Sequence, residues 1–290
     1  MLSCPAMEED ARRLAATLER AGKGLILAVT GAGVSAPSGL PTFRGKDPGA
    51  LWNRDVTEMG TRHFFERDPV TWWTWFLDRF EGLDAAEPNP AHLALAALER
   101  WQLGRGGDFL LLTQNIDTLH ERAGSRRLVK LHGTSDRLRC SRPGCRLGSP
   151  SGSLPRSEAG LETFRHNPGR ATLPRCPDCG ALLRAHVLLF DEYYDEHSDY
   201  GFDRVEDAAE RMALVLFAGT SFSVGVTDFV LRAALGWRTP VISIDPAAAP
   251  PFPGITGLRA PAEEILPAAC RELSIEVSES VWKSAPRGDL

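Results

Sequence analysis

The chain has few lysines and no run of basic residues. Only four of its 33 basic residues are lysine, and the formal net charge is −5 with a sequence isoelectric point of about 5.9. Nucleic-acid-binding proteins usually carry a basic patch or stripe, so we expect no nucleic-acid partner. The longest apolar runs, residues 25–29 and 213–218, have the length of a strand and are far shorter than a membrane span, so we also expect no membrane segment.

The sequence also lacks the features of secreted, disordered and repetitive proteins. Its first residues, MLSCPAMEEDARR, contain acidic side chains and no apolar segment, so we expect no signal peptide and a cytoplasmic location. No internal repeat or low-complexity tract is present. Hydrophobic residues make up 43% and charged residues 24% of the 290-residue chain, a globular composition that argues against intrinsic disorder. We expect a monomer with one large domain or two small ones.

Continuous apolar runs alternate with helical patterns along most of the chain. A run such as LILAVT, bounded by glycines, is typical of a strand that is buried on both faces of a parallel sheet. Buried strands that alternate with helices predict an α/β fold with a Rossmann-like, doubly wound parallel sheet. We expect strands at 25–30, 109–113, 213–219 and 241–245, and helices at 8–22, 91–102 and 203–212.

Two stretches interrupt this alternation. Residues 46–88 are rich in Trp and Phe and have a helical pattern, whereas residues 137–186 have little apolar periodicity and hold four cysteines. The two insertions predict a small second domain, made of a helical module and a zinc module. We expect residues 1–45, 87–136 and 187–282 to form the Rossmann-like domain, residues 46–86 and 137–186 to form the small domain, and residues 283–290 to form a tail.

The first candidate site follows the first strand, in the sequence GAGVSAPSGLPTFRG. Gly31, Gly33 and Ala36 match the G-x-G-x-x-G/A pattern, in which small residues let backbone amides approach a pyrophosphate. Glycines after a strand are also common in tight turns, so the pattern alone leaves both interpretations open. The two prolines that follow indicate a loop. A loop that carries Phe43 and Arg44 suggests a site that closes over its ligand.

Two further motifs follow apolar runs. After FLLLT, the side chains of Gln114, Asn115 and Asp117 supply donors, acceptors and one carboxylate, and open parallel sheets bind ligands at this end of their strands. A helix cap is the alternative role for Asp117. His132, in LVKLHGTSD, has an ordinary pKa that suits a general base near neutral pH, and Gly133 leaves its ring accessible. A structural histidine is the alternative there.

Four of the six cysteines form two pairs, Cys140 with Cys145 and Cys176 with Cys179. In a chain without a secretory signal, such pairs are more typical of metal ligands than of disulfides. Four thiolates make a tetrahedral zinc site with no open position, so we predict one structural Zn. A redox dithiol or chance spacing is the alternative for one pair alone. Because the segment between the pairs has few apolar residues, we expect zinc to supply part of its folding free energy.

Two motifs come late in the chain. GTSFSV, at 219–224, follows a strand and offers small residues and hydroxyls that suit a phosphate or a ribose. Asp245 ends another strand, at a place where acidic residues bind ribose hydroxyls. HVLLFDEYY, at 186–194, has the pattern of an exposed sheet edge, which predicts a site for an extended peptide by strand addition. An ordinary sheet edge is the alternative.

In this order, the motifs GAGVSAPSGLPTFRG, TQNID, LHG, the two cysteine pairs, HVLLFDE and GTS resemble the sirtuin (Sir2) family of NAD-dependent protein deacylases. The resemblance implies a Rossmann domain joined to a small zinc-binding and helical domain, with NAD as co-substrate. It also implies a reaction in which NAD and an acyl-lysine protein or peptide give nicotinamide, deacylated lysine and O-acyl-ADP-ribose. Deacetylation is the expected form of this activity.

The resemblance implies roles for individual residues. His132 is the expected catalytic base, which takes a proton from a ribose hydroxyl, while Asn115 and Asp117 are expected to order the nicotinamide and its ribose. The expected cofactor-binding residues are Gly31, Ala32, Gly33, Ser35, Thr42, Phe43, Arg44, Gln114, Asn115, Asp117, Gly219, Thr220, Ser221, Asp245 and Ala262. The expected substrate residues are Phe76, Arg79, Val187, Leu188, Phe190, Asp191, Glu192 and Val224.

The chain departs from the family pattern in four places. Asp191 stands where the family usually has glycine, and a carboxylate there predicts a changed sequence preference or a preference for basic substrates. The family's proline after Val224 is absent, and Asp245 replaces the usual asparagine. Members that remove succinyl or malonyl groups carry Tyr-x-x-Arg; here Phe76 stands in place of the tyrosine, while Arg79 keeps the arginine, which could still pair with an acidic acyl chain. Because the tyrosine hydroxyl is lost, we expect desuccinylation to be weak or absent.

Two other functions fit the same features. NAD hydrolysis or ADP-ribosyl transfer would use the same cleft, with water or a protein side chain in place of the acyl oxygen, and would release nicotinamide without an acyl-lysine peptide. A non-catalytic NAD-binding or zinc-dependent interaction protein is the third possibility. The presence of His132 beside Asn115 and Asp117 argues against it, because a protein that only binds NAD needs no base.

Overall fold

The structure is a computed structural model of the chain, and it describes residues 5–42, 54–220, 222, 225–246 and 253–277. Some of the expected site residues and the expected tail lie outside these ranges. They are Phe43, Arg44, Ser221, Val224 and residues 283–290.

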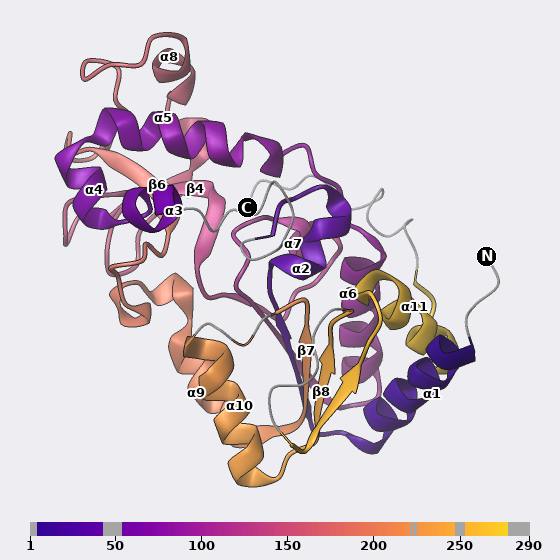
Figure 1. The fold of residues 1–290 in the computed structure, drawn as a ribbon. Coiled ribbons are helices and arrows are strands. Elements are labelled where there is room, and N and C mark those ends of the chain that lie inside the picture. The colour runs from indigo at the N-terminus through magenta and orange to yellow at the C-terminus, as the bar shows by residue number, and fades with distance from the viewer. Residues whose placement is uncertain (1–4, 43–53, 221, 223–224, 247–252, 278–290) are drawn as a thin grey trace.

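A six-stranded parallel sheet forms the larger part of the molecule (Figure 1). Its order, β3-β2-β1-β7-β8-β9, places the first strand near the centre, as in a Rossmann fold. The apolar runs form strands here because both faces of the sheet are covered, and every residue of β1 is buried. The strands are β1 (Leu25–Thr30), β2 (Asp108–Thr113), β3 (Leu128–Lys130), β7 (Met212–Ala218), β8 (Val241–Ile244) and β9 (Ile255–Leu258).

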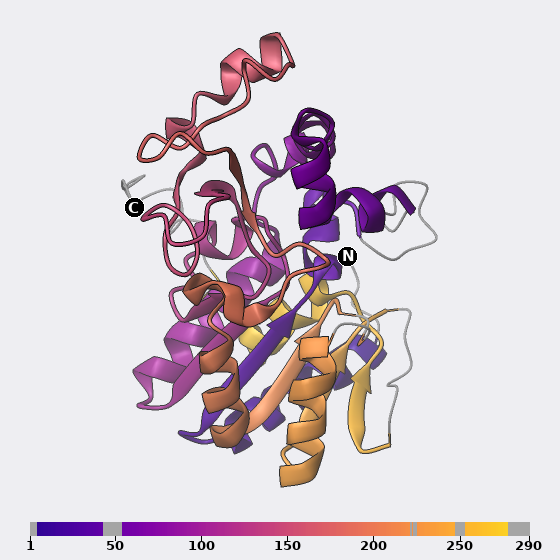
Figure 2. The same ribbon diagram turned by 90° about the vertical axis from the view of Figure 1, so that its left-hand side faces the viewer.

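Helices cover both faces of this sheet, and the side chains of β1 alternate between them. Ile26 and Ala28 pack in one apolar cluster with α1, α6 and α11, whereas Leu25, Leu27 and Val29 pack in another with α9 and α10. Figures 1 and 2 show the two groups of helices on opposite sides of the sheet. The predicted doubly wound α/β fold is therefore confirmed. The helices are α1 (Pro5–Arg20), α6 (Pro90–Gly104), α9 (Phe202–Arg211), α10 (Gly225–Trp237) and α11 (Ala262–Glu272).

The two insertions pack against each other. Trp72, Trp73 and Phe76 of α5 share one apolar cluster with Leu138 and Leu183 of a second, antiparallel sheet, whose order is β5-β4-β6. The indole Nε1 of Trp73 donates to the carbonyl of Leu183 at 3.0 Å. The boundaries of the two domains stay a prediction. These elements are α3 (Arg54–Met59), α4 (Arg62–Arg67), α5 (Pro69–Phe80), β4 (Gly133–Cys140), β5 (Leu154–Pro155), α8 (Leu161–His166) and β6 (Leu183–Val187).

The segment between the cysteine pairs buries more apolar surface than its sequence indicates. Leu154, Leu161, Phe164 and Leu173 all belong to the cluster that includes the aromatic side chains of α5. Burial of such side chains stabilises a segment by about 1.5–3 kcal/mol each. The contribution of zinc to the folding free energy of this segment stays a prediction, and α5 supplies apolar surface that the segment itself does not contain.

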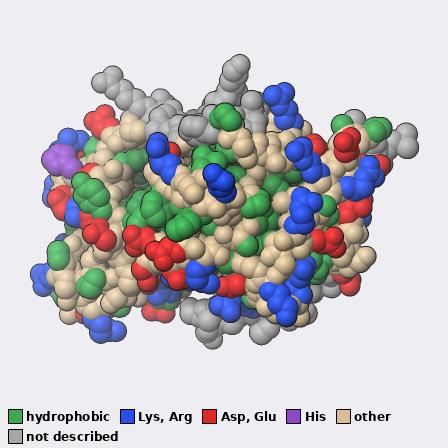
Figure 3. Space-filling view, turned by 90° about the horizontal axis from the view of Figure 1, so that it is seen from below, with side chains coloured by type: hydrophobic (Ala, Val, Ile, Leu, Met, Phe, Trp, Pro, Cys, Tyr) green, Lys and Arg blue, Asp and Glu red, His purple; other side chains and the backbone are tan. Residues whose placement is uncertain are grey.

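Short helices connect these elements. None of the helices in the described ranges combines the length and the apolar composition that a membrane-spanning helix needs. On the face seen from below, basic and acidic side chains are interspersed around a central apolar area (Figure 3). The short helices are α2 (Ala32–Ser35), α7 (Leu119–Arg122) and the 3₁₀ helices η1 (Ala36–Ser38), η2 (Glu81–Leu83), η3 (Arg156–Glu158), η4 (Tyr194–Glu196) and η5 (Ser198–Tyr200).

Candidate active site

The strand order reverses between β1 and β7, and the loops after these two strands touch each other. The amide of Gly33 donates to the carbonyl of Gly219 at 3.0 Å. A Cβ on Gly33 would lie 2.8 Å from Cα of Gly219, and a Cβ on Gly31 would lie 2.8 Å from the carbonyl oxygen of Gly219. Side chains at these positions would push the loops apart, so the glycines allow the close approach. Doubly wound folds bind their ligands in the crevice at this point of the sheet.

Two cavities open along this crevice. The larger, of about 810 Å³, extends from the loops after β1 and β7 to α5 and to the segment after β6; we call it the large cavity. The small cavity, of about 270 Å³, shares several wall residues with it. All described residues that the sequence predicts to bind cofactor line one or both: Gly31, Ala32, Gly33, Thr42, Gln114, Asn115, Gly219, Thr220, Asp245 and Ala262 line the large cavity, and Ala32, Ser35, Asn115 and Asp117 the small one.

A chain of hydrogen bonds joins the loops after β1, β2 and β7. Nδ2 of Asn115 donates to the hydroxyl of Ser35 at 3.0 Å, and that hydroxyl donates to Oδ2 of Asp117 at 2.9 Å. Nε2 of Gln114 donates to Oγ1 of Thr220 at 3.1 Å. All five side chains are buried. Buried polar groups that are mutually hydrogen-bonded are held in one orientation, so this network presents fixed donors and acceptors to the cavities.

Asp117 has the geometry of both a helix cap and a ligand-binding residue, the two roles that its sequence position left open. Its Oδ1 accepts a hydrogen bond from the backbone amide of Leu119 at 3.1 Å, in the turn that begins α7. Its Oδ2 faces Ser35, and the residue lines the small cavity. One oxygen therefore holds the turn, and the other belongs to the network that faces the cavity.

His132 lies after β3, half-buried, and lines the large cavity. Burial disfavours the imidazolium and lowers the pKa of His132 to about 4, although contact with the backbone of Gln114 opposes this effect. The carbonyl of His132 accepts a hydrogen bond from the amide of Leu188 at 2.9 Å. At neutral pH the imidazole is therefore uncharged, which is the state that a general base requires.

Tyr194 is a neighbour of His132 that the sequence analysis does not single out. Its hydroxyl lies 3.4 Å from Nε2 of His132, and it also lines the large cavity. Tyr193 is the adjacent residue and is 74% exposed. The only sequence signal is the position of both tyrosines directly after HVLLFDE, and this signal does not tell one from the other.

Two buried histidines lie behind the hydrogen-bonded loops, and Nε2 of His92 is 3.5 Å from the hydroxyl of Ser35. Nε2 of His120 lies 3.0 Å from the hydroxyl of Thr30, and the rings of His92 and His120 are 4.7 Å apart. Burial lowers the pKa of His92 to about 4, with Asp117 opposing the shift. Burial also lowers the pKa of His120, and the neighbouring His92 and Lys130 lower it further. The folded chain therefore holds these imidazoles in their neutral form.

We expect the free energy of unfolding to decrease when the pH is lowered from 7.5 to 5.0. The pKa of His92 is about 4 in the folded chain against an ordinary 6.5, so the unfolded chain takes up this proton first. The contribution of the neutral imidazole of His92 to the free energy of unfolding is complete above pH 6.5 and is lost as the pH falls to 4. For His92 alone the loss at pH 5 is about 2 kcal/mol. His120 and His132 act in the same direction.

Urea denaturation at the two pH values, with zinc content checked at both, measures this difference. His166 is exposed on α8, so the His166→Gln variant is expected to show the same pH dependence as the unmodified chain. Equal stability at pH 7.5 and 5.0 would contradict the burial of neutral imidazoles.

The segment after β6, residues 187–192, forms one wall of the large cavity. Strand β6 lies at an edge of the small sheet. The amide of Leu188 donates to the carbonyl of His132, and the amide of Phe190 donates to the carbonyl of Gly60 at 3.0 Å. The segment is therefore held between the loop that carries His132 and the turn before α4.

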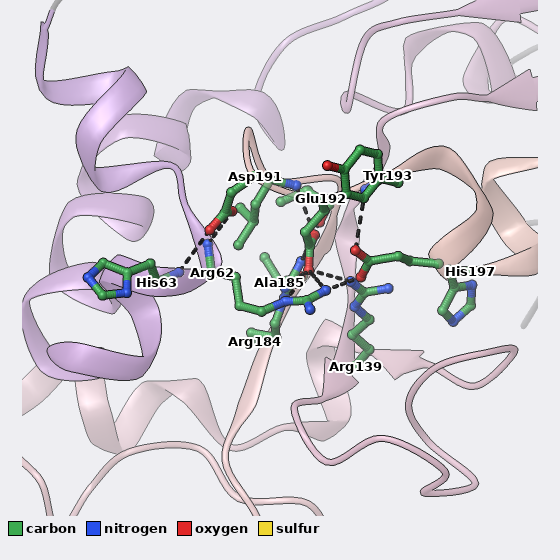
Figure 4. Close-up of polar contacts among 12 residues, drawn as sticks. Arg62, His63, Arg139, Arg184, Ala185, Asp191, Glu192, Tyr193 and His197 are labelled. Carbon is green, nitrogen blue, oxygen red and sulfur yellow. Dashed lines mark hydrogen bonds and ion pairs between the residues drawn. The ribbon is translucent and has the colours of Figure 1, made fainter.

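Asp191 lines neither cavity. Its Oδ1 accepts from the backbone amide of Arg62 at 2.6 Å and its Oδ2 from that of His63 at 3.1 Å, so the carboxylate caps the first turn of α4 (Figure 4). The expected direct effect of Asp191 on peptide preference has no support in this geometry. The carboxylate instead links the segment 187–192 to α4 through these two hydrogen bonds.

Glu192 is buried and accepts hydrogen bonds from three arginines (Figure 4). Its Oε1 lies 2.5 Å from Nη1 of Arg184, 2.6 Å from Nη2 of Arg62 and 3.1 Å from Nη2 of Arg139. Burial alone would raise the pKa of Glu192, but the hydrogen bonds and charge of Arg184 and the charge of Arg139 lower it to about 2. Although Glu192 is part of the cavity wall, its carboxylate is engaged in holding β4, β6 and α4 together.

Phe76 and Arg79 lie on the same helix, α5, but line different cavities. Phe76 contributes to the large cavity together with Trp75 and Phe80. Arg79 lines the small cavity, to which Asp117 also contributes. The two residues that align with the Tyr-x-x-Arg pattern are therefore not walls of one common pocket.

The four cysteines that the sequence predicts as ligands lie together, with all Sγ atoms within 4.8 Å of one another. Sγ of Cys140 is 3.5 Å from that of Cys179, and Sγ of Cys145 is 3.7 Å from that of Cys176. A tetrahedral site with Zn–S bonds of about 2.3 Å needs Sγ atoms about 3.8 Å apart, whereas a disulfide needs about 2.05 Å. The donor set fits a structural zinc ion.

A second group of possible metal ligands consists of His186, His197 and Asp199. Nε2 of His186 lies 3.1 Å from Oδ2 of Asp199. Burial lowers the pKa of both histidines, and the charge of Arg139 adds to this effect. The hydrogen bond with His186 is the main cause of the lowered pKa of Asp199, to which the charge of Arg137 also contributes. Because these cations would repel a metal ion, we interpret the group as a hydrogen-bonded cluster.

The chain is similar to known proteins over most of its length. The family model described as "Sir2 family" matches residues 31–226. An NAD-dependent protein deacylase from Thermus thermophilus is 39% identical over 246 residues, covering 84% of this chain and 86% of that protein. The NAD-dependent protein deacylase from Pyrococcus furiosus is 34% identical over 261 residues, covering 87% and 94%. A crystal structure of a Sir2 homolog–NAD complex superimposes with a TM-score of 0.73 and 35% identity, covering 91% of this chain and 93% of that one. The resemblance seen in the motifs is confirmed, and the chain belongs to the Sir2 family.

Proposed function

We propose that this chain is an NAD-dependent protein-lysine deacylase, which converts NAD and an acyl-lysine protein or peptide into nicotinamide, deacylated lysine and O-acyl-ADP-ribose. The proposal depends on the position of His132, whose neutral imidazole faces the large cavity between the glycine loops and the segment 187–192. The relatives from Thermus thermophilus and Pyrococcus furiosus are named NAD-dependent protein deacylases, and a structural relative is a complex with NAD, which supports it.

NAD is the co-substrate and supplies the ribose that accepts the acyl group. In our proposal the loops after β1 and β7 hold its phosphates, and Asp245, which follows β8, binds ribose hydroxyls. Asn115 and Asp117 hold the nicotinamide end at the small cavity. Nε2 of His132 accepts the proton of a ribose hydroxyl. Because an acyl oxygen is a weak nucleophile, fixed polar groups and alignment of the reactants are more important here than a strong base.

The acyl-lysine peptide would lie along the segment 187–190. This segment continues from β6, which is an edge strand of the small sheet, and it lines the large cavity within reach of His132. Extended peptides add to such edges through main-chain hydrogen bonds. Because the amides of Leu188, Leu189 and Phe190 already donate to His132, Glu192 and Gly60, the segment would offer its carbonyls to the peptide.

The side chains around the large cavity favour an uncharged acyl group. Trp75, Phe76 and Phe80 contribute apolar surface, and Arg79 instead lines the small cavity, to which Asp117 also contributes. A succinyl carboxylate in the large cavity would therefore be desolvated without the tyrosine hydroxyl and without an arginine among the described residues that line this cavity. We accordingly expect acetyl-lysine to be a much better substrate than succinyl-lysine.

A panel of acyl-lysine peptides tests both the function and the acyl preference. Nicotinamide and deacylated peptide are followed together at matched peptide concentrations, and with acetyl-lysine we expect equal amounts of both. With succinyl-lysine we expect rates at least tenfold lower, because an unpaired buried carboxylate costs more than about 1.4 kcal/mol. Equal rates on the two peptides would contradict the acyl preference. Nicotinamide release that is independent of any acyl-lysine would instead favour NAD hydrolysis or ADP-ribosyl transfer. The cytoplasmic location and the monomeric state stay predictions.

A further inference from the structure

Tyr194 has a contact that no predicted role explains. It begins η4, directly after the segment 187–192, and its ring is nearly parallel to that of His132, with an interplanar angle of 16° and a centroid distance of 6.1 Å. Its hydroxyl lies 3.4 Å from Nε2 of His132. Its other face stacks on Phe202 of α9, at 5.2 Å and 11°. Packing on α9 therefore fixes the ring, and through it the place of the hydroxyl.

The direction of the hydrogen bond follows from the chemistry of the two groups. Burial raises the pKa of Tyr194, so the phenol keeps its proton and donates. Nε2 of His132 accepts this proton only when it carries a lone pair. That is the same form in which the imidazole acts as a base.

We propose that Tyr194 is a positioning residue for the base: its hydroxyl donates to Nε2 of His132 and holds the neutral imidazole toward the large cavity before the co-substrate binds. The inference rests on the proposed function, because it assigns Tyr194 a role relative to the base. A ribose hydroxyl that reaches Nε2 takes the place of the phenol, so the contact belongs to the free enzyme.

The proposal predicts a shift in the titration of His132. A donor to the neutral imidazole stabilises that form, so removing the donor raises the pKa of the imidazole. A hydrogen bond of this kind corresponds to about half to one pH unit. Among the described residues, the backbone of Gln114 also contacts the ring, and the charged residues that line the same cavity are Glu192, Asp245 and Glu263; the substitution changes none of them.

Tyr194→Phe keeps the ring and its stacking and removes only the hydroxyl. The pKa of His132, followed by NMR in the zinc-loaded protein without substrates, is expected to rise by about half to one unit. Tyr193→Phe is the matched control, because Tyr193 is exposed, and it should leave the titration unchanged. This measurement needs no turnover, so it distinguishes a failure of this inference from a failure of the proposed deacylase activity.

A second readout uses the reaction. The pH dependence of kcat/KM for NAD reports the enzyme before NAD binds, and its acidic limb should move to higher pH in Tyr194→Phe. A shift of half to one unit from a pKa of about 4 lowers kcat/KM at pH 5 by about 1.2- to 1.8-fold. Tyr194→Trp, which keeps an aromatic ring with an N–H donor, serves as a second variant should the first be poorly folded, and it is expected to move the limb less. An unchanged imidazole pKa in folded Tyr194→Phe would overturn the proposal. So would a loss of thermal stability with no shift of the limb.

Discussion

Replacing His132 by alanine is expected to lower deacylation and acyl-lysine-dependent nicotinamide release by about 10²- to 10⁴-fold, the range that a general base contributes. The neutral imidazole faces the large cavity, and alanine cannot accept a proton there. The hydrogen bond from the amide of Leu188 uses the carbonyl of His132, so the wall of the cavity should stay in place. Initial rates at pH 7.5 with saturating NAD and an acetyl-lysine peptide measure the effect.

The controls separate catalysis from folding. His132→Ala is expected to retain its zinc, because His132 is not one of the four clustered cysteine ligands, and to bind NAD with an affinity within a few-fold of the unmodified chain, as judged by calorimetry. His166→Ala, at an exposed position on α8, should keep full activity. A folded His132→Ala protein that turns over at the original rate would remove the imidazole from the mechanism.

The strands of the large sheet could be predicted where they are apolar and buried on both faces. LILAVT is such a run, and it forms β1 at the centre of the sheet. Strand β9, Ile255–Leu258, has the sequence ITGL and lies at the edge, where three of its four residues are only partly buried. A short strand with a glycine and one partly open face carries no pattern that distinguishes it from a loop.

The site could be predicted where it depends on chain segments that directly follow strands. The carboxyl ends of parallel strands meet at one edge, so Asn115 and Gly219 could be expected there together. Tyr194 and Asp191 depend instead on contacts across 62 and 129 residues, with His132 and Arg62. Those contacts depend on how the segment after β6 lies against α4 and against the loop that carries His132, and no local pattern in the sequence encodes that placement.

Loss of the zinc ion is expected to unfold the small sheet and to abolish deacylation while leaving NAD binding to the large sheet measurable. Cys140 ends β4, and Cys176 and Cys179 precede β6, so the thiolates hold the two strands that carry Arg139 and Arg184. These arginines fix Glu192 and with it the segment 187–192. Structural zinc contributes about 10–16 kcal/mol in zinc-finger peptides, so even a fraction of this is comparable with the 5–15 kcal/mol that stabilise a typical domain.

Cys176→Ser tests this dependence without a chelator. We expect the purified variant to contain less than one zinc per chain, to melt at a lower temperature and to deacylate an acetyl-lysine peptide at least tenfold more slowly, given the loss of the wall beside the base. Cys270→Ser is the matched control, because Cys270 lies in the core of the large sheet and outside the cysteine cluster, and it should keep one zinc per chain. The apolar contacts of Leu161 and Phe164 with the α5 cluster are retained in Cys176→Ser. A zinc-free protein with full activity and an unchanged melting temperature would mean that these contacts alone hold the small sheet.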